Sequence, residues 1–263
     1  MQSERVAHHI VQWLTDYAQQ AGSQGFVVGV SGGIDSAVTS TLAAQTGLPL
    51  TCVEMPIHQN PDQVTRAQAH IQQLARRFPQ VEPQRVDLTG PYEAFLQALP
   101  ESPATEQREM SRVNTRARLR MSTLYYFAAL QGRLVAGTGN KVEDFGVGFY
   151  TKYGDGGVDL SPIADLLKTE VYALGHYLEV PQSILEAPPT DGLWGDDRTD
   201  EDQIGASYPE LEWAMGQQAA GKAPSDFSGR KNEVFSLFLK HQRNNLHKMK
   251  PIPVCHVPPE MKE

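Results

Sequence analysis

Cysteine is scarce in this sequence. Only Cys52 and Cys255 occur among 263 residues. They lie far apart and outside any C-x-x-C pattern, so the chain offers neither a disulfide framework nor a cysteine-rich zinc site. A small core residue in a strand-like run is the expected role of Cys52, and a loose-end thiol that of Cys255. We therefore expect a reducing compartment and, since the N-terminus has no leader-like apolar region, the cytoplasm.

Long apolar runs and an excess of basic residues are lacking as well. No run approaches the roughly 18 apolar residues that cross a bilayer. The chain has 23 Lys and Arg against 31 Asp and Glu, a net charge of -8. This balance disfavours a broad electrostatic grip on nucleic acid or anionic lipid. We expect a small-molecule substrate, no nucleic-acid partner and no membrane contact.

What the chain does have is an alternation of short apolar runs and amphipathic segments. The runs FVVGV, LPLTCVEMP, VEPQRVDLT and RLVAG predict strands, and the segments between them predict helices. Such alternation is typical of right-handed βαβ units. It predicts a doubly wound α/β fold, a mostly parallel sheet with helices on both faces, in one domain over residues 1–263. Surface loops are expected at residues 99–111, 187–202 and 221–231, which are rich in Pro, Gly and charge.

The segment VVGVSGGIDS, residues 27–36, joins the first expected strand to a helix. Open α/β sheets bind ligands at the carboxyl ends of their strands. The small residues 31–33 let backbone amides approach an anion, while Asp35 and Ser36 can cap the helix or serve a metal and a phosphate. Asp35 stands where a Walker A loop has its lysine. The segment predicts a phosphate-binding loop of another type, with an ordinary glycine turn as the alternative.

A second unusual stretch, residues 137–168, concentrates glycines, acids, aromatics and lysines. Thr138 ends a predicted strand and can reach a nucleotide. Glu143 is a hard oxygen ligand that suits Mg²⁺. Lys152 and Lys168 can balance phosphate charge. A glycine-rich hairpin with solvated charges is the alternative interpretation.

Both stretches resemble known signatures. SGGIDS resembles the pyrophosphate-binding SGGxDS loop of the ATP-pyrophosphatase, or PP-loop, superfamily, whose fold is of the adenine nucleotide alpha hydrolase type. GTGNK with the later FYTKYGDGGVDLSPIADLLK resembles the signature of the NAD⁺ synthetases. The resemblance extends to Asn114, Arg118, Thr190 and residues 247–248 and so covers nearly the whole chain. It implies ATP-dependent amidation of deamido-NAD⁺ (nicotinic acid adenine dinucleotide) by ammonia, through an acyl adenylate, with release of AMP and pyrophosphate.

Carried onto this sequence, the resemblance implies an ATP site and a metal site. The ATP contacts would be Val30, Ser31, Gly32, Gly33, Ile34, Asp35, Ser36, Thr138, Lys168 and Thr190. The metal would be Mg²⁺, held by Asp35 and Glu143. The loop between Glu143 and Lys152 departs from the commoner family spacing, so Asp144 remains an alternative to Glu143.

The resemblance also implies a second substrate site and a catalytic set. Deamido-NAD⁺ would be bound by Arg118, Lys152, Asp159, His247 and Lys248. The catalytic residues would be Asp35, Lys168, Asp155 and Thr190, with Asp155 near the ammonia site. Residues 143–157 and 188–203 are expected to close over the site when ligands bind.

The resemblance further implies a homodimer with the substrate site at its interface. The predicted helix over residues 113–132 carries an apolar stripe that could serve this contact or could pack on its own sheet: Met121, Leu124, Tyr125 and Ala128. Glutamine-dependent relatives have a separate amidase domain, for which this chain has no spare length. We therefore expect direct use of ammonia.

Two other functions stay open at this stage. A tRNA-modifying enzyme could carry the same loop, although the acidic balance and the two dispersed cysteines count against it. A non-catalytic adenine-nucleotide-binding module is the other alternative. It would leave Glu143, Lys168 and the GDGG turn without a purpose.

Overall fold

The computed structural model describes residues 1–190 and 199–262. Its centre is a sheet of four strands in the order β3-β2-β1-β4, and every pairing is parallel. The strands are β1 (Phe26–Gly29), β2 (Leu50–Glu54), β3 (Val81–Arg85) and β4 (Leu134–Val135). All four lie within the apolar runs that predicted strands. The edge strand β3 tolerates Pro83 because an edge strand can lack one backbone N–H in its ladder.

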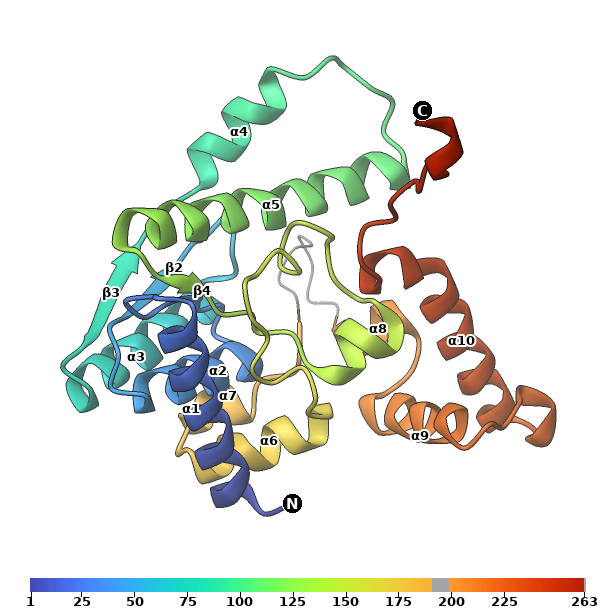
Figure 1. Cartoon of the computed structure of the whole chain (residues 1–263), viewed down its shortest axis with the longest axis horizontal. Helices are drawn as coiled ribbons and strands as arrows, with labels where there is room; N and C mark the ends of the chain where they lie inside the picture. The colour runs from blue at the N-terminus through green and yellow to red at the C-terminus, as the bar shows by residue number, and fades with distance from the viewer. Residues whose placement is uncertain (191–198, 263) are drawn as a thin grey trace.

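Helices cover both faces of the sheet (Figure 1). Side chains alternate along a strand, so Phe26 and Val28 enter one core while Val27 enters another. The first core includes residues of α1 (Ser3–Gln20), α2 (Ile34–Gln45), α3 (Pro61–Arg77) and α6 (Lys168–Tyr177). The second includes residues of α4 (Thr89–Gln97) and α5 (Glu106–Gln131). The doubly wound prediction is confirmed.

The strand order reverses beside β1. From β1 the chain adds β2 and then β3 on one side, whereas β4 pairs with the other side of β1. In open α/β sheets the crevice at such a reversal, at the carboxyl ends of the strands, is where ligands bind. The loop after β1 holds the predicted phosphate-binding residues, and the loop after β4 leads to Thr138 and Glu143. The topology therefore brings the two unusual stretches of the sequence together.

The remaining helices form what we call the C-terminal region: α8 (Asp200–Ile204), α9 (Tyr208–Ala219), η2 (Pro224–Asp226) and α10 (Arg230–Met249). Its core is a third hydrophobic cluster, which includes Leu211, Phe235 and Phe238. Val142 and Val147 of the π-helix η1 (Val142–Val147) belong to the same cluster, so the loop after β4 is packed against this region. A short helix, α7 (Gln182–Leu185), precedes it. The single domain over residues 1–263 stays a prediction.

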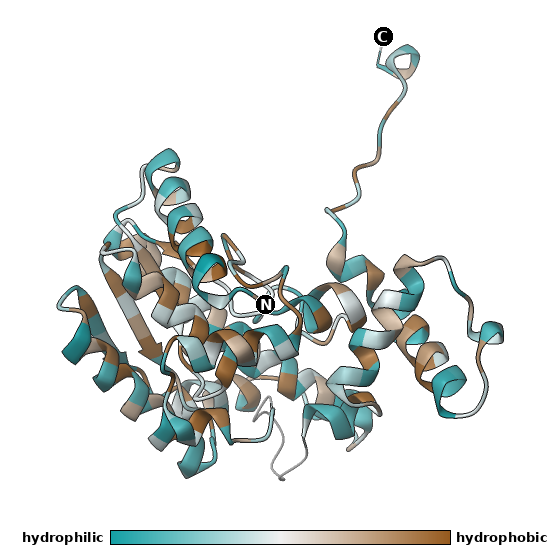
Figure 2. Cartoon of the chain, turned by 90° about the horizontal axis from the view of Figure 1, so that it is seen from below, coloured by the Kyte–Doolittle hydropathy of each residue, from teal (hydrophilic) through white to brown (hydrophobic). Residues whose placement is uncertain are grey.

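The chain after α10 projects away from the body of the molecule (Figure 2). It contains one turn, η3 (Pro259–Met261), and residues 250–262 are exposed. Cys255 lies in this segment, whereas Cys52 lies in the first core, and both are free thiols. Both cysteines thus have the surroundings that the sequence predicted.

All three expected surface loops are in part helical, since α8 begins at Asp200 within residues 187–202. Helix α5 begins at Glu106 because the Thr105 hydroxyl accepts a hydrogen bond from the Arg108 N–H at 3.2 Å and caps the helix. The stretch 221–231 contains η2 and the start of α10. The loop predictions for 99–111, 187–202 and 221–231 were therefore wrong at these positions. Within the stretch 187–202, residues 191–198 lie outside the described residues, and the closing of residues 143–157 and 188–203 stays a prediction.

Three of the four residues of the α5 stripe pack on the sheet of the same chain, whereas Met121 lines a cavity. Ala128 is 3% exposed, and Leu124 lies against the second core beside Gly29 of β1. Exposed apolar side chains of α5 include Tyr126 and Leu130, which are not part of the stripe. Of the two interpretations of the stripe, packing on its own sheet is the one that holds. It gives the expected dimer no support.

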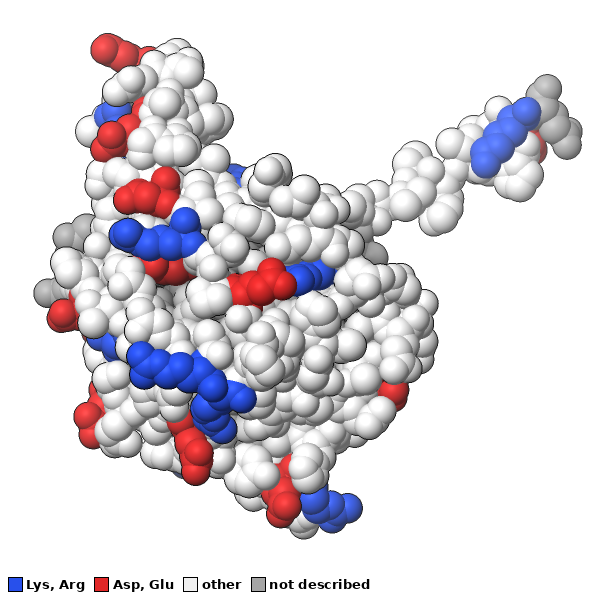
Figure 3. All heavy atoms as spheres, turned by 90° about the vertical axis from the view of Figure 1, so that its left-hand side faces the viewer, with Lys and Arg blue, Asp and Glu red and all other residues white. Residues whose placement is uncertain are grey.

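Charged side chains of both signs are interspersed over the face seen in Figure 3. No broad basic patch covers that face, in keeping with the net charge of -8. Among the helices that the structure describes, none combines the length and the apolar character that a membrane crossing needs.

Candidate active site

The loop between β1 and α2 is held by its own hydroxyl groups. The Ser36 hydroxyl accepts from the Ser31 N–H at 3.2 Å and donates to the Gly33 carbonyl at 3.0 Å. Gly32 has φ +85, and a Cβ there would collide with the carbonyl oxygen of Gln63 in α3. Only glycine fits this position. The loop passes directly into α2, whose first-turn N–H groups have no partner within the helix and favour an anion.

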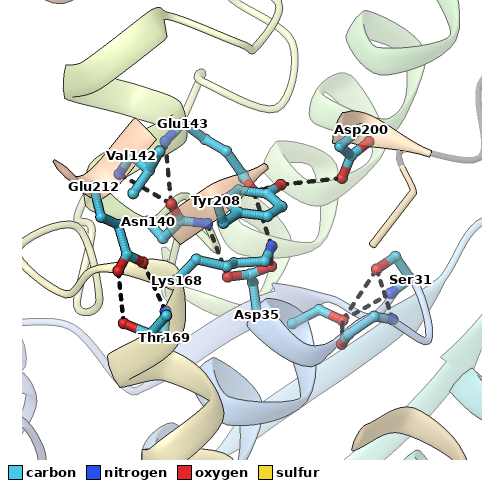
Figure 4. A network of polar contacts seen from close by, with 12 residues as sticks. Ser31, Asp35, Asn140, Val142, Glu143, Lys168, Thr169, Asp200, Tyr208 and Glu212 are labelled. Carbon is cyan, nitrogen blue, oxygen red and sulfur yellow. Dashed lines mark hydrogen bonds and ion pairs between the residues drawn. The ribbon is translucent and has the colours of Figure 1, made fainter. Parts of the chain in front are cut away.

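Three charged side chains meet at the start of α2 (Figure 4). Lys168 Nζ lies 2.6 Å from Asp35 Oδ2 and 2.8 Å from Glu143 Oε1. Asp35 stands in the first turn of α2, Glu143 in η1, and Lys168 is the first residue of α6. The Lys168 side chain is 4% exposed, so both ion pairs are well shielded from water. Three sequence-predicted residues are thereby brought into direct contact.

Burial and pairing oppose each other in this cluster. Burial disfavours a charged Lys168, but Asp35 and Glu143 outweigh it and raise the pKa of the ammonium above its ordinary value. Burial raises the pKa of Asp35 despite the attraction of Lys168. At Glu143 burial acts in the same direction, but Lys168 and the hydrogen bonds prevail and lower the pKa. With both carboxylates ionised the cluster holds one positive and two negative charges. Its net charge of -1 therefore favours the binding of a further cation.

Asn140, which was not among the predicted site residues, contacts the Asp35 carboxylate and the backbone of Glu143. Its side chain is fully buried; Nδ2 donates to Asp35 Oδ1 at 3.1 Å. Its Oδ1 accepts from the N–H groups of Val142 and Glu143, both at 3.1 Å. Asn140 thus ties the start of η1 to the first turn of α2. The available signal was its place directly after GTG, five residues after the end of β4.

Tyr208 and Asp200 were also missed. The Tyr208 hydroxyl lies 2.6 Å from Glu143 Oε1 and 3.3 Å from Asp200 Oδ2, and its ring centre lies 4.7 Å from Lys168 Nζ. Burial and the nearby carboxylates raise the pKa of Tyr208, so the hydroxyl stays a neutral donor. Both residues come from the C-terminal region, and neither belongs to a motif quoted for the site.

The structure separates the roles of Glu143 and Asp144. Glu143 reaches Lys168, whereas the Asp144 carboxylate lies over Gly139, where a Cβ would collide with it. Burial and three nearby carboxylates raise the pKa of Asp144 well above its ordinary value. The alternative assignment of Asp144 to the metal site therefore lacks the contact with Lys168.

One cavity of about 260 Å³ contains most of the predicted residues. All ten predicted ATP contacts line it: Val30, Ser31, Gly32, Gly33, Ile34, Asp35, Ser36, Thr138, Lys168 and Thr190. Glu143, Asp144 and Asp155 line it as well. Desolvation raises the pKa of Asp155, although the Thr151 N–H donates to its Oδ1 at 2.9 Å and favours the charged form. The cavity thus joins a phosphate-binding loop to a cluster of carboxyl groups.

None of the five predicted deamido-NAD⁺ contacts lines this cavity; three of them form a chain of hydrogen bonds, and a fourth contacts the same loop. Arg118 Nη2 donates to the Lys152 carbonyl at 3.3 Å, and Lys152 Nζ donates to the His247 carbonyl at 2.7 Å. The neighbouring Lys248 Nζ donates to the carbonyl of Tyr150 at 2.7 Å. We call Arg118, Lys152, His247 and Lys248 the basic group. It joins α5 and the loop after η1 to the end of α10.

Asp159, the fifth predicted contact, lies apart from the basic group. Its carboxylate accepts from the Val135 N–H at 2.8 Å and from the Tyr125 hydroxyl at 2.9 Å. It therefore ties the end of β4 to α5. These bonds give Asp159 a structural role, whether or not a ligand also reaches it.

Asp35 and Glu143 fit the Mg²⁺ assignment in their chemistry. Both present hard carboxylate oxygens to one cationic atom, Lys168 Nζ. In the part of the chain that the structure describes, no three His, Cys, Asp or Glu side chains converge as a metal site. Mg²⁺ bound by two carboxylates takes its other ligands from substrate phosphates and water. The donor set therefore suits a metal that arrives with a nucleotide.

Comparisons with known proteins agree with this geometry. Residues 6–251 match the model of the NAD synthase family. The NH(3)-dependent NAD(+) synthetase of Methanosarcina mazei is 37% identical over 258 residues, which cover 97% of this chain and 98% of that protein. That of Syntrophomonas wolfei is 36% identical over 264 residues, and the alignment covers 100% of both chains.

Solved structures show the same fold. The NMN synthetase from Francisella tularensis has a TM-score of 0.83 and 33% identity, covering 98% of this chain and 99% of that one. The NH3-dependent NAD synthetase from Campylobacter jejuni has a TM-score of 0.77 and 24% identity over 97% of this chain and 100% of that one, a likeness in fold. The extent of the family match and the identity to full-length relatives leave one assignment: the chain belongs to the NAD synthase family.

Proposed function

We propose that this chain is a ligase that amidates deamido-NAD⁺ to NAD⁺ with ATP and ammonia. The observation that carries the proposal is the contact of Lys168 with Asp35 and Glu143, directly beside the phosphate-binding loop and inside one cavity. Family membership favours this function over a tRNA-modifying enzyme or a non-catalytic nucleotide-binding module. A non-catalytic module would also leave the paired carboxylates of Asp35 and Glu143 without a function, and the net charge of -8 counts against a tRNA substrate.

The first step activates a poor acyl donor. A carboxylate oxygen of the nicotinate group attacks the α-phosphorus of ATP, and the bond from that phosphorus to the bridging oxygen breaks. Pyrophosphate leaves with the electron pair and is held by residues 31–36 at the start of α2. Lys168 offsets the charge that develops on the phosphate oxygens. Thr138 and Thr190, which line the same cavity, contact ATP.

Asp35 and Glu143 would hold Mg²⁺, which when bound neutralises part of the phosphate charge. The chain's own contribution is to keep the two carboxylates in place. Asn140 does so at Asp35 and at the backbone of Glu143. Lys168 contacts both carboxylates and lines the cavity, so its charge lies next to the phosphates.

The second step forms the amide. Ammonia attacks the acyl carbon of the adenylate, and AMP leaves with the electron pair of the broken C–O bond. Because most ammonia is protonated at neutral pH, the Asp155 carboxylate would hold ammonium and accept its proton. The raised pKa of Asp155 makes it a stronger base for this transfer. The basic group would bind the phosphates of deamido-NAD⁺, with Asp159 nearby.

The decisive assay compares nitrogen donors. Purified protein with ATP, Mg²⁺ and deamido-NAD⁺ is expected to make NAD⁺ with ammonium chloride and not with glutamine. AMP and pyrophosphate should appear in amounts equal to NAD⁺. Production of ADP and phosphate would contradict the adenylate route, and the absence of NAD⁺ with either donor would contradict the function.

A second substrate is favoured by one observation. The similar chain from Francisella tularensis, with its TM-score of 0.83, is described as an NMN synthetase. The corresponding substrate here would be nicotinic acid mononucleotide, which carries the same nicotinate carboxylate without the adenylate half. The ratio of kcat/KM for the two acids decides between them. A ratio that favours the mononucleotide would reassign the substrate and leave the chemistry unchanged.

We also propose a homodimer in the cytoplasm. An isologous two-fold contact is the commonest arrangement among oligomers. The face of α5 that carries Tyr126 and Leu130 is exposed and is one surface available for it. Light scattering at assay concentration measures the state, and a fully active monomer would exclude a shared site. Cell fractionation tests the location.

A further inference from the structure

We propose that Tyr208 is a positioning residue that fixes Lys168 and Glu143 for the adenylation step. Tyr208 is the first residue of α9 and is 3% exposed. Its ring and its hydroxyl contact two different members of the charged cluster. The inference rests on the proposed function, because only then do Lys168 and Glu143 act on ATP.

The ring of Tyr208 restricts the ammonium of Lys168. Asp35 and Glu143 occupy two sides of Nζ, and the aromatic face lies at 4.7 Å on another. Cations favour this position over an aromatic ring. The Lys168 side chain also lines the cavity. With its other sides occupied, the ammonium is held toward the space where phosphates would bind.

The hydroxyl of Tyr208 orients the carboxylate of Glu143. Oε1 of Glu143 accepts from both Tyr208, at 2.6 Å, and Lys168, at 2.8 Å. The phenol has one proton, and the distance of 3.3 Å to Asp200 makes that acceptor the weaker one. Glu143 Oε1 is thereby held by two donors, Lys168 from α6 and Tyr208 from the C-terminal region. Its orientation depends on that region.

The position of Tyr208 is itself fixed by its own region. Its backbone N–H donates to Glu201 Oε1 at 2.7 Å, and the preceding Ser207 N–H donates to Glu210 Oε2 at 2.9 Å. Tyr208 also belongs to the third hydrophobic cluster. The aromatic ring is therefore presented to Lys168 by α8 and α9 and not by the sheet. The C-terminal region completes the ATP site in this way.

The experiment removes one oxygen atom. Tyr208→Phe keeps the ring and its packing. We expect the single-turnover rate of pyrophosphate release without ammonia to fall about 10- to 100-fold, in line with the loss of a hydrogen bond to a charged group. The KM for ATP should change less than about threefold, because ground-state binding is left intact. The thermal midpoint should stay within a few degrees, and Tyr208→Leu, which also removes the ring, should be slower still.

Tyr92→Phe is the matched control. Tyr92 is also 3% exposed, but it lies in the second core under the guanidinium of Arg116, outside the cavity lining. Its variant should keep the wild-type rate of pyrophosphate release. A wild-type rate in Tyr208→Phe would overturn the inference. So would a parallel loss of rate, ATP affinity and thermal midpoint, which would show a structural role alone. A wild-type protein that releases no pyrophosphate would instead refute the proposed function, and the inference with it.

Discussion

The sheet edge and the C-terminal region contribute to one site by different means. At the sheet edge, Asp35 and Lys168 stand in the first turns of helices that begin at the carboxyl side of the parallel strands. In the C-terminal region, Tyr208 and Asp200 reach the same site from helices with a hydrophobic cluster of their own. The first set is placed by strand order, and the second by the packing of α8–α10 against η1.

The two regions differ in what they contribute to the proposed reaction. The sheet-edge groups carry the charges that phosphate chemistry needs, and the strand β1 behind them is fully buried at Phe26, Val27 and Val28. The C-terminal groups orient those charges through hydrogen bonds and one aromatic ring. Changes at the sheet edge should therefore alter the reaction most, and changes farther into the C-terminal region should have smaller effects.

The largest effect is expected from Asp35→Asn. The variant keeps the size of the side chain but removes one of the two charges proposed for Mg²⁺ and pyrophosphate. We expect pyrophosphate release to fall by about 10³-fold or more, the scale of other losses at phosphoryl-transfer sites. The thermal midpoint should be retained. Turnover close to the wild-type value at saturating Mg²⁺ would show that the sheet edge does not carry the chemistry.

Lys168→Met tests the electrostatics of the same edge. Loss of the buried ammonium leaves Asp35 and Glu143 without their shared partner, and breaking a buried pair costs about 3–5 kcal/mol in the free energy of unfolding. Urea unfolding measures this cost. Adding Glu143→Gln to Lys168→Met should recover at least about 1 kcal/mol, because the remaining repulsion is removed. An equally unstable double variant would assign the loss to packing.

The Lys168→Met loss should also depend on pH. Burial already raises the pKa of Asp35 in the folded protein, and without Lys168 the pKa rises further. A carboxyl group with a raised folded-state pKa binds its proton more readily when folded, so stability increases as the pH falls. The gap between wild type and variant should therefore narrow on acidification from neutral pH. A gap that is constant with pH would contradict the electrostatic account.

Lys152→Met examines the junction of the two regions, since Lys152 Nζ contacts the His247 carbonyl of α10. We expect the KM for deamido-NAD⁺ to rise about tenfold while the KM for ATP stays near its wild-type value, as for lost ground-state binding. Lys141→Met is the matched control. Lys141 pairs with the exposed Asp165 and belongs to neither the predicted ATP contacts nor the predicted deamido-NAD⁺ contacts. Equal increases in both KM values would contradict the division into two substrate sites.

The smallest effect is expected within the C-terminal region, at Glu210. Hydrogen bonds from Arg230 and from the Ser207 N–H lower its pKa to about 2. Because the pKa of Glu210 is lower in the folded protein, its ionised form stabilises the fold at pH values above the ordinary Glu pKa near 4.3. This stabilisation is lost as the pH falls toward about 2. Glu210→Gln should therefore cost at most about 1 kcal/mol at pH 7, because the pair is partly exposed. Thermal unfolding should show a smaller difference in stability between wild type and Glu210→Gln at pH 3 than at pH 7.

Much of the sheet and its phosphate loop could be predicted from the sequence. The apolar runs and the turn of residues 31–33 are local patterns, and local patterns determine strands, turns and helix starts with little help from distant residues. The residue types alone showed that Lys168 can balance phosphate charge and that Glu143 offers a hard oxygen ligand. The resemblance to a family assigned Glu143 to the metal site and Lys168 to the ATP site, and only the structure showed that the two side chains form an ion pair.

Only the tertiary structure decided which groups share a contact across long separations. Tyr208 and Glu143 are 65 residues apart in sequence, and no periodic pattern links them. The two hydrogen bonds that tie Asp159 to Val135 and Tyr125 were equally unpredictable. For the α5 stripe, the sequence left open whether it packs on its own sheet or serves a dimer contact, and the structure shows the packing. Composition and local pattern determined which elements form and which charges they carry. The position of each side chain in the site was decided by how the helices pack, because packing depends on shape complementarity between segments that are distant in the chain.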